Sequence, residues 1–179
     1  GCAAMSPEAV RAAVAGSGVR PRPAAQSREW GYQRLTAGRS TLIFDGGPPP
    51  TDDRADFGCA STLALEFSHG HDRIFVNCGG AALIGAHLSA DLSRALRTTA
   101  AHSTLCLADT NSTAIERGGQ MGLGVEEVTC HRRHSDQGQR IEGSHDGYDR
   151  NFGFVHKRVV VLAEDGLQLR GLDTLLPGA

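Results

Sequence analysis

One histidine stands where a chain could use it for proton transfer. Residues 97–112 read RTTAAHSTLCLADTNS, so His102 directly precedes a strand-like run at residues 104–107, which Asp109 closes with a polar turn. A histidine at the mouth of a buried strand is held by rigid backbone and can transfer a proton or bind a metal. In the simpler, structural interpretation His102 caps the strand and hydrogen-bonds a loop. Spacing alone favours this second interpretation, because single histidines are more often structural.

A second polar group, SHDGY at residues 144–148, is followed closely by Arg150. Its His145 and Tyr148 could form an acid–base pair, because a neutral imidazole or a tyrosinate flanked by positive charge can remove a carbon-bound proton. The alternative is a hairpin turn at the DG dipeptide, whose flanking side chains satisfy one another. Chemistry alone favours the turn, and the sequence contains no GxSxG, no phosphate-binding glycine loop and no HExxH.

The elements that would position these residues are mostly strands. Period-two hydrophobic patterns separated by turns begin at Trp30, and VVVL at residues 159–162 suits a strand buried on both faces. The dipeptide Asp165-Gly166 is a strong hairpin signal. About nine short strands with little helix indicate an all-β fold, an antiparallel β-sandwich with long loops. We expect strands at residues 30–36, 41–44, 62–68, 73–78, 104–107, 125–133, 139–144, 152–162 and 167–172.

Helix is expected in two short stretches. Ser6 as N-cap and Pro7 at the first helical position open a short N-terminal helix that Gly16 or Gly18 ends. Leucines at helical spacing predict a second helical excursion within residues 81–101. We therefore expect residues 1–29 to form a helical and extended segment, which we interpret as the tail of a preceding helical domain, and residues 30–177 to form the sandwich.

Composition excludes several classes of protein. The chain has 179 residues, with 18 basic and 20 acidic side chains. Because this composition has no excess of basic residues, a nucleic-acid partner is not expected. Aromatic residues make up only 5%, too few for a broad stacking surface. Five cysteines without a CxxC pair do not indicate a redox compartment. No apolar run is long enough to span a membrane, and the first residues lack the pattern of a signal peptide.

Six segments occur in a fixed order along the chain. They are GYQRLTAGR (31–39), FDGGPPP (44–50), TLALEFS (62–68), VNCGG (76–80), TTAAHSTLCLAD (98–109) and SHDGYDRNFGFVHKR (144–158). In this order they resemble the C-terminal β-sandwich of the heparinase II/III-like family over about residues 31–176. The specificity of the resemblance comes from the order of the whole set.

The resemblance implies a bacterial polysaccharide lyase that cleaves uronate-containing glycans by β-elimination. In such a reaction a base removes the proton α to the carboxylate, and an acid protonates the departing glycosidic oxygen. A helical α/α toroid normally precedes the sandwich and supplies an asparagine and a tyrosine. The resemblance therefore implies an acidic polysaccharide as ligand, a helical toroid domain of the same or another chain as partner, and a periplasmic location.

The chain also departs from the family's pattern. Before the third strand many lyases carry an HxHADxLSFE-type segment whose histidines serve catalysis or a structural zinc, but residues 57–66 read FGCASTLALE. The family's acidic metal ligand on the next strand is matched by Asn77. His102, Cys59 and Asn77 are thus weak candidates for a metal site. These departures disfavour a complete structural zinc site, and the sequence requires no cofactor.

We predict from the resemblance that the chain lines one wall of a glycan-binding cleft and is inactive alone. His102, His145 and Tyr148 are its candidate acid–base residues. Arg97 and Arg150 are candidate ligands of a uronate carboxylate, which a guanidinium matches with two hydrogen bonds. The alternative is a non-catalytic structural or protein-interaction module derived from the same fold, which the missing histidines favour.

Overall fold

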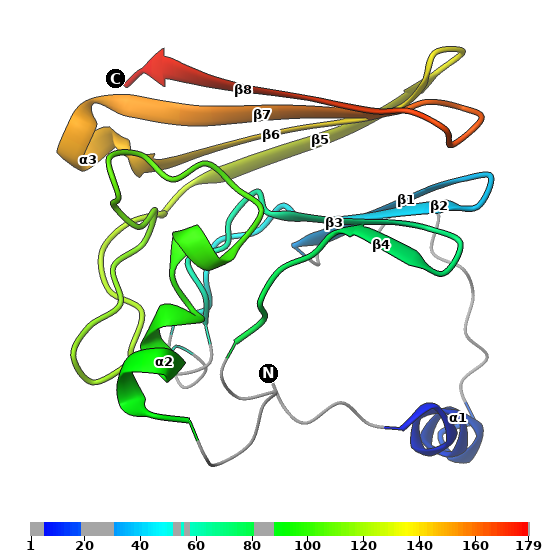
Figure 1. Cartoon of the computed structure of the whole chain (residues 1–179), viewed down its shortest axis with the longest axis horizontal. Coiled ribbons are helices and arrows are strands. Elements are labelled where there is room, and N and C mark those ends of the chain that lie inside the picture. Colours follow the sequence, from blue (N-terminus) through cyan, green and yellow to red (C-terminus); the bar gives the residue numbers. More distant parts are fainter. Residues whose placement is uncertain (1–5, 19–30, 52–54, 56–57, 81–87, 179) are drawn as a thin grey trace.

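A computed structural model describes residues 6–18, 31–51, 55, 58–80 and 88–178 of the chain. Expectations for residues 1–5, for residues 19–30 and for the first part of the helical excursion lie outside these residues. The described strands form two four-stranded antiparallel sheets that pack face to face, as predicted (Figure 1). The fold is therefore an all-β sandwich.

The first sheet is a meander in which each strand pairs with the next along the chain. Gly38 and Gly70 turn its hairpins with φ angles of 53° and 61°, a backbone region that glycine enters without steric cost. The sheet consists of β1 (Tyr32–Ala37), β2 (Ser40–Asp45), β3 (Leu65–His69) and β4 (Asp72–Phe75).

The second sheet is also a meander, and its strands are longer. The predicted turn at Asp165-Gly166 is confirmed between its last two strands, where Gly166 has a φ of 72°. The sheet consists of β5 (Val128–Ser135), β6 (Gly138–Tyr148), β7 (Phe154–Leu162) and β8 (Leu169–Pro177).

Short helices lie outside the two sheets. The predicted cap of α1 (Pro7–Gly16) is confirmed, since the Ala9 N–H donates to Ser6 Oγ over 3.1 Å. The predicted excursion contains α2 (Ala90–Ala95), and in Figure 1 α1 and α2 lie beyond the β1–β4 sheet. Two further short helices are the 3-10 helix η3 (Thr99–Ala101) and α3 (Asp149–Phe152).

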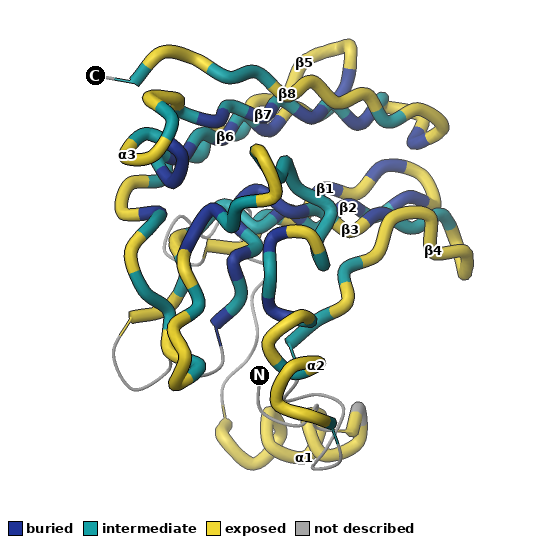
Figure 2. The backbone as a smooth tube through the Cα atoms, turned by 60° about the vertical axis from the view of Figure 1, so that its left-hand side comes forward, coloured by how far each residue is buried: buried dark blue, intermediate teal, exposed yellow. Residues whose placement is uncertain are grey.

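The hydrophobic core lies between the sheets, where Figure 2 shows the buried backbone positions. Alternation along β7 buries Val160 and Leu162 but leaves Val159 and Val161 only partly buried on the other face. The expectation that this strand is buried on both faces is therefore wrong, because the described residues place no layer over its outer side. The core cluster comprises Leu35, Ala37, Leu42, Phe44, Leu63, Phe67, Ile141, Val160 and Leu162.

Three local predictions are corrected. The strand expected at residues 62–68 begins only at Leu65, because Leu63 has a φ of 63° and its N–H donates to the Asp45 carbonyl over 2.7 Å. Residues 104–107 form no strand, only an isolated bridge between Leu107 and Thr110. The DG dipeptide at residues 146–147 is no hairpin turn but lies within β6, beside a register shift.

Candidate functional site

His102 ends the 3-10 helix η3 and is partly buried, not placed at the mouth of a strand. Its Nδ1 lies 2.8 Å from the Thr98 carbonyl oxygen. Because a carbonyl only accepts, Nδ1 carries the proton and Nε2 keeps its lone pair, with no hydrogen bond from the described residues. Burial lowers the pKa of His102, although the Thr98 carbonyl and Glu66 act in the opposite direction. This imidazole is therefore neutral and can accept a proton at Nε2.

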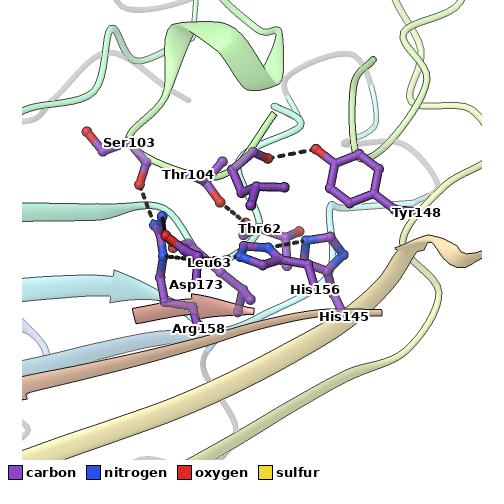
Figure 3. A network of polar contacts seen from close by, with 10 residues as sticks. Thr62, Leu63, Ser103, Thr104, His145, Tyr148, His156, Arg158 and Asp173 are labelled. Atoms are coloured by element: carbon purple, nitrogen blue, oxygen red, sulfur yellow. Dashed lines mark hydrogen bonds and ion pairs between the residues drawn. The ribbon is translucent and has the colours of Figure 1, made fainter. Parts of the chain in front are cut away.

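His145 is almost completely buried and belongs to a chain of directed hydrogen bonds (Figure 3). The Gly147 N–H donates to His145 Nδ1 over 3.0 Å, so the proton of the neutral ring sits on Nε2. That Nε2–H donates to Nδ1 of His156 over 3.1 Å. His156 Nε2–H in turn donates to the Asp173 carboxylate over 2.7 Å. One backbone amide thus sets the tautomers of two histidines.

Arg158 ties this chain to the segment that carries His102. Its guanidinium forms two hydrogen bonds with the Asp173 carboxylate, of 2.7 and 2.8 Å. The same guanidinium donates to the carbonyls of Leu63 and Ser103 over 2.8 and 2.6 Å. Ser103 directly follows His102, so the second sheet holds the backbone beside the candidate base (Figure 3).

The electrostatics of this network suit a structural role. Burial, His156 and Arg158 together lower the pKa of His145 to about 3. Burial alone would raise the pKa of Asp173, but hydrogen bonds from His156 and Arg158 and their charges hold it well below its usual range. His145 is neutral at pH 7 and both of its nitrogens are occupied, so it has no free position for a substrate proton.

Tyr148 is fully buried, and its hydroxyl donates to the Leu105 carbonyl over 2.7 Å. Burial and the nearby Cys106 raise the pKa of Tyr148 to about 12. A tyrosinate base is therefore disfavoured at neutral pH. His102, His145 and Tyr148 do not share an open face, because two of the three are enclosed.

Arg97 serves the protein's own backbone. It is buried, and its guanidinium donates to the carbonyls of Gly58, Ala55 and Gly119, with distances of 2.5 Å to Gly58 and 2.9 Å to Ala55. These bonds occupy all three guanidinium nitrogens, so Arg97 is not placed to grip a carboxylate in this conformation. Arg150, by contrast, is exposed on α3.

The weak metal candidates do not assemble into a site. The side-chain amide of Asn77 hydrogen-bonds backbone groups: it accepts from the Ser103 N–H over 2.7 Å and donates to the Leu65 carbonyl over 3.4 Å. Burial raises the pKa of the Cys59 thiol, which disfavours a thiolate ligand, although Arg97 acts in the opposite direction. Within the described ranges, no three His, Cys, Asp or Glu side chains gather as metal ligands. These residues do not fit a structural zinc.

Sequence reasoning did not single out His156, Arg158 and Asp173 as a unit. Register could have joined them, since His145 pairs with His156 across β6 and β7, and Arg158 pairs with Asp173 across β7 and β8. Two side chains spaced by two residues share a face of a strand, so HKR at residues 156–158 already carried this signal.

Comparisons with known proteins point to one family. A family model described as "Heparinase II/III-like, C-terminal" matches residues 19–179. The FtsZ-localized protein C of Caulobacter vibrioides is 29% identical over 181 residues, which cover 97% of this chain and 30% of that protein. The chain thus spans about a third of the length of this relative.

Two solved structures share the fold. A crystal structure of heparinase III superposes with a TM-score of 0.59 at 14% identity, covering 83% of this chain and 21% of the other. A heparinase III gene product with methylated lysines gives a TM-score of 0.54 at 12% identity, covering 86% and 23%. At such identities these structures support the architecture alone. Together with the matched family model, they show that this chain belongs to the heparinase II/III-like family, of which it is a C-terminal domain.

Proposed function

We propose that this domain forms one wall of a cleft for a uronate-containing glycan, with His102 facing the sugar. The observation that carries the proposal is the state of the His102 ring: the Thr98 carbonyl holds the Nδ1 proton, and Nε2 has no partner among the described residues. A neutral imidazole fixed in this way is suited to general-base catalysis. Family membership supports the choice of an acidic glycan.

In the proposed β-elimination, Nε2 of His102 takes the proton α to the uronate carboxylate. The electrons of that C–H bond form the new C=C bond, and the bond to the glycosidic oxygen breaks. The oxygen then takes a proton from an acid that this domain does not offer, because Tyr148 and His145 are enclosed. Residues from a helical domain would complete the site, so the domain alone is expected to bind glycan without cleaving it.

The test uses the complete gene product on heparan sulfate and alginate, with absorbance of the unsaturated uronate as readout. We expect His102→Ala to lower the rate at least a hundredfold, in the range typical of a lost general base. The matched control is His71→Ala, which removes an exposed histidine from the turn between β3 and β4. No cleavage by the complete protein, together with unchanged glycan binding by His102→Ala, would reject the proposal.

The second candidate is a non-catalytic protein-interaction module. Its support is that Arg97, His145 and Tyr148 are all occupied by the protein's own groups. The relative named FtsZ-localized protein C adds weight, because the similarity extends over nearly this entire chain. Co-sedimentation of this chain with FtsZ polymers, combined with absent lyase activity, would favour this candidate. Lyase activity lost in His102→Ala would favour the first.

A further inference from the structure

The β5–β8 sheet has an outer face on which basic and aliphatic side chains are separated. We define the outer face as the side chains of these strands that point away from the core. One cross-strand row on it follows from the register as Arg133–Arg140–Val161–Arg170, and the next as His131–Glu142–Val159–Leu172. Arginines therefore gather at one end of the sheet, and aliphatic side chains lie along β7 and β8.

The charge on this face opposes that of the whole chain. Four basic side chains, Arg133, Arg140, Lys157 and Arg170, share this face with two acidic side chains, Glu142 and Asp146, whereas the chain has a net charge of −2. Asp146 is occupied by backbone, because it accepts from the N–H groups of Glu126 and Glu127 over 2.9 and 3.1 Å. Glu142 is already paired with Arg140 and, over 2.5 Å, with Lys157. No carboxylate of the described residues pairs with the other two arginines.

The aliphatic part of this face is open to solvent. Leu172 is 64% exposed and Leu176 is 39% exposed. Figure 1 shows no described element above the β5–β8 sheet, whereas α1 and α2 lie beyond the opposite sheet. This face is therefore available in the described part of the chain, and it lies on a different layer from β3 and Glu66, near which His102 is found.

The free edge of β8 offers a way to bind a partner here. β8 is the last strand of its sheet and pairs with β7 over nine residues without a register shift. Natural edge strands are usually shortened, bulged or charged, because a long regular edge is a template for another strand. The charge of the Asp173 carboxylate does not oppose strand addition at this edge, because Asp173 is bound to Arg158 and His156.

We propose that the β8 edge and the outer face bind an extended acidic segment of another protein, added as a fifth strand. An added strand would place alternate side chains beside Arg170, Leu172 and Leu176, because side chains on one face of a strand recur every second residue. A carboxylate fits beside Arg170, and apolar side chains fit beside the two leucines. A second copy of this chain fits less well, since it brings more arginines. An anionic membrane also fits less well, since the face has no Trp or Tyr.

The probe is a fluorescein-labelled nine-residue peptide with Thr at every second position and Val or Glu at the positions between. The control peptide has the same sequence with Lys in place of each Glu. We expect the acidic peptide to bind this chain at least tenfold more tightly than the Lys-containing control peptide. Replacing Arg170 by serine should weaken binding about tenfold, whereas Arg73→Ser on the exposed strand β4 should not. Circular dichroism of each variant establishes that it is folded.

Backbone pairing is tested with two N-methylated acidic peptides, methylated at odd or at even positions. Only one of the two should lose binding, because alternate amides of a strand point to opposite sides. Equal binding of the acidic and basic peptides, or full binding by the Arg170→Ser variant, would overturn the proposal. So would binding of phosphatidylserine vesicles in place of the peptide, or self-association that excludes it. Each result is independent of glycan binding at His102.

Discussion

Nε2 of His145 lies 3.1 Å from Nδ1 of His156 inside the sandwich, and a single backbone N–H decides which ring donates. The Gly147 amide fixes the proton of His145, and this orientation passes along the chain to the Asp173 carboxylate. Protonation of His145 would put two donors toward Gly147 and His156 and break that order. The network is therefore a source of acid sensitivity.

Stability is predicted to fall as the pH falls from about 6.5 toward 3. An unfolded histidine has a pKa near 6.5, whereas the pKa of folded His145 is about 3, so the unfolded state binds a proton that the fold excludes. This contributes about 2 kcal/mol of lost stability between pH 7 and 5. His145→Asn retains an acceptor for the Gly147 N–H and should show a flatter pH dependence in urea titrations. His71→Asn is the matched control, and equal slopes in His145→Asn and the parent would contradict the prediction.

Arg158→Met should destabilise the fold by roughly 2–4 kcal/mol, because Asp173 loses two of its hydrogen bonds and the Leu63 and Ser103 carbonyls lose a charged donor. The loss should also loosen the backbone beside His102. Hydrogen exchange of residues 102–104 should therefore quicken more than exchange in β2, which the substitution does not touch directly. Arg170→Met, on the outer face of β8, is the control. Unchanged exchange at residues 102–104 would show that Arg158 does not hold this segment.

Arg97→Met should cost about 2–4 kcal/mol, since the carbonyls of Ala55, Gly58 and Gly119 would lose a charged donor. Thermal unfolding measures this cost. A glycan-binding role would give the reverse pattern: full stability with lost affinity for heparan sulfate. Arg150→Met, at an exposed position, should leave stability nearly unchanged and is the direct test of a surface role in glycan binding.

Asp45→Asn should be more stable than the parent protein at pH 8, and this gain should be smaller at pH 4. Burial raises the pKa of Asp45 to about 6 despite hydrogen bonds from Ser61 and Gly47. The folded state therefore binds more protons than the unfolded state between about pH 4 and 6, and the parent loses stability as the pH rises through that window. Removing the charge should recover about 1–2 kcal/mol. Asp136→Asn on an exposed turn is the control, and the same pH dependence in Asp45→Asn and the parent would refute this account.

The sequence predicted the architecture better than the site. Hydrophobic alternation and turn residues act locally, so the capped first helix and the Asp165-Gly166 hairpin were predictable. The family resemblance was likewise confirmed. The course of residues 104–107 was not predictable from local pattern. The apolar run there packs as a loop, because the Tyr148 hydroxyl holds the Leu105 carbonyl.

Side-chain orientation explains the remaining errors. The family resemblance and the polar residue types suggested an open cleft, yet His145 and Tyr148 point into the protein. The partner of His145, His156, lies 11 residues further along the chain, and Asp173, the partner of His156, lies another 17 residues on. These three residues meet only through strand register. A β-sandwich core can hold polar groups when every one is hydrogen-bonded, and sequence composition does not distinguish that case from a surface site.

The central claim is that His102, and not the buried histidine pair, meets the glycan. Histidine ring ¹⁵N and ¹H resonances report the tautomer and surroundings of each imidazole, so titration of this chain with a heparan sulfate oligosaccharide tests it directly. We predict that the His102 ring signals shift, while His145 and His156 keep the Nε2–H tautomer and their positions. Shifts at His145 and His156 with an unmoved His102 would contradict the claim.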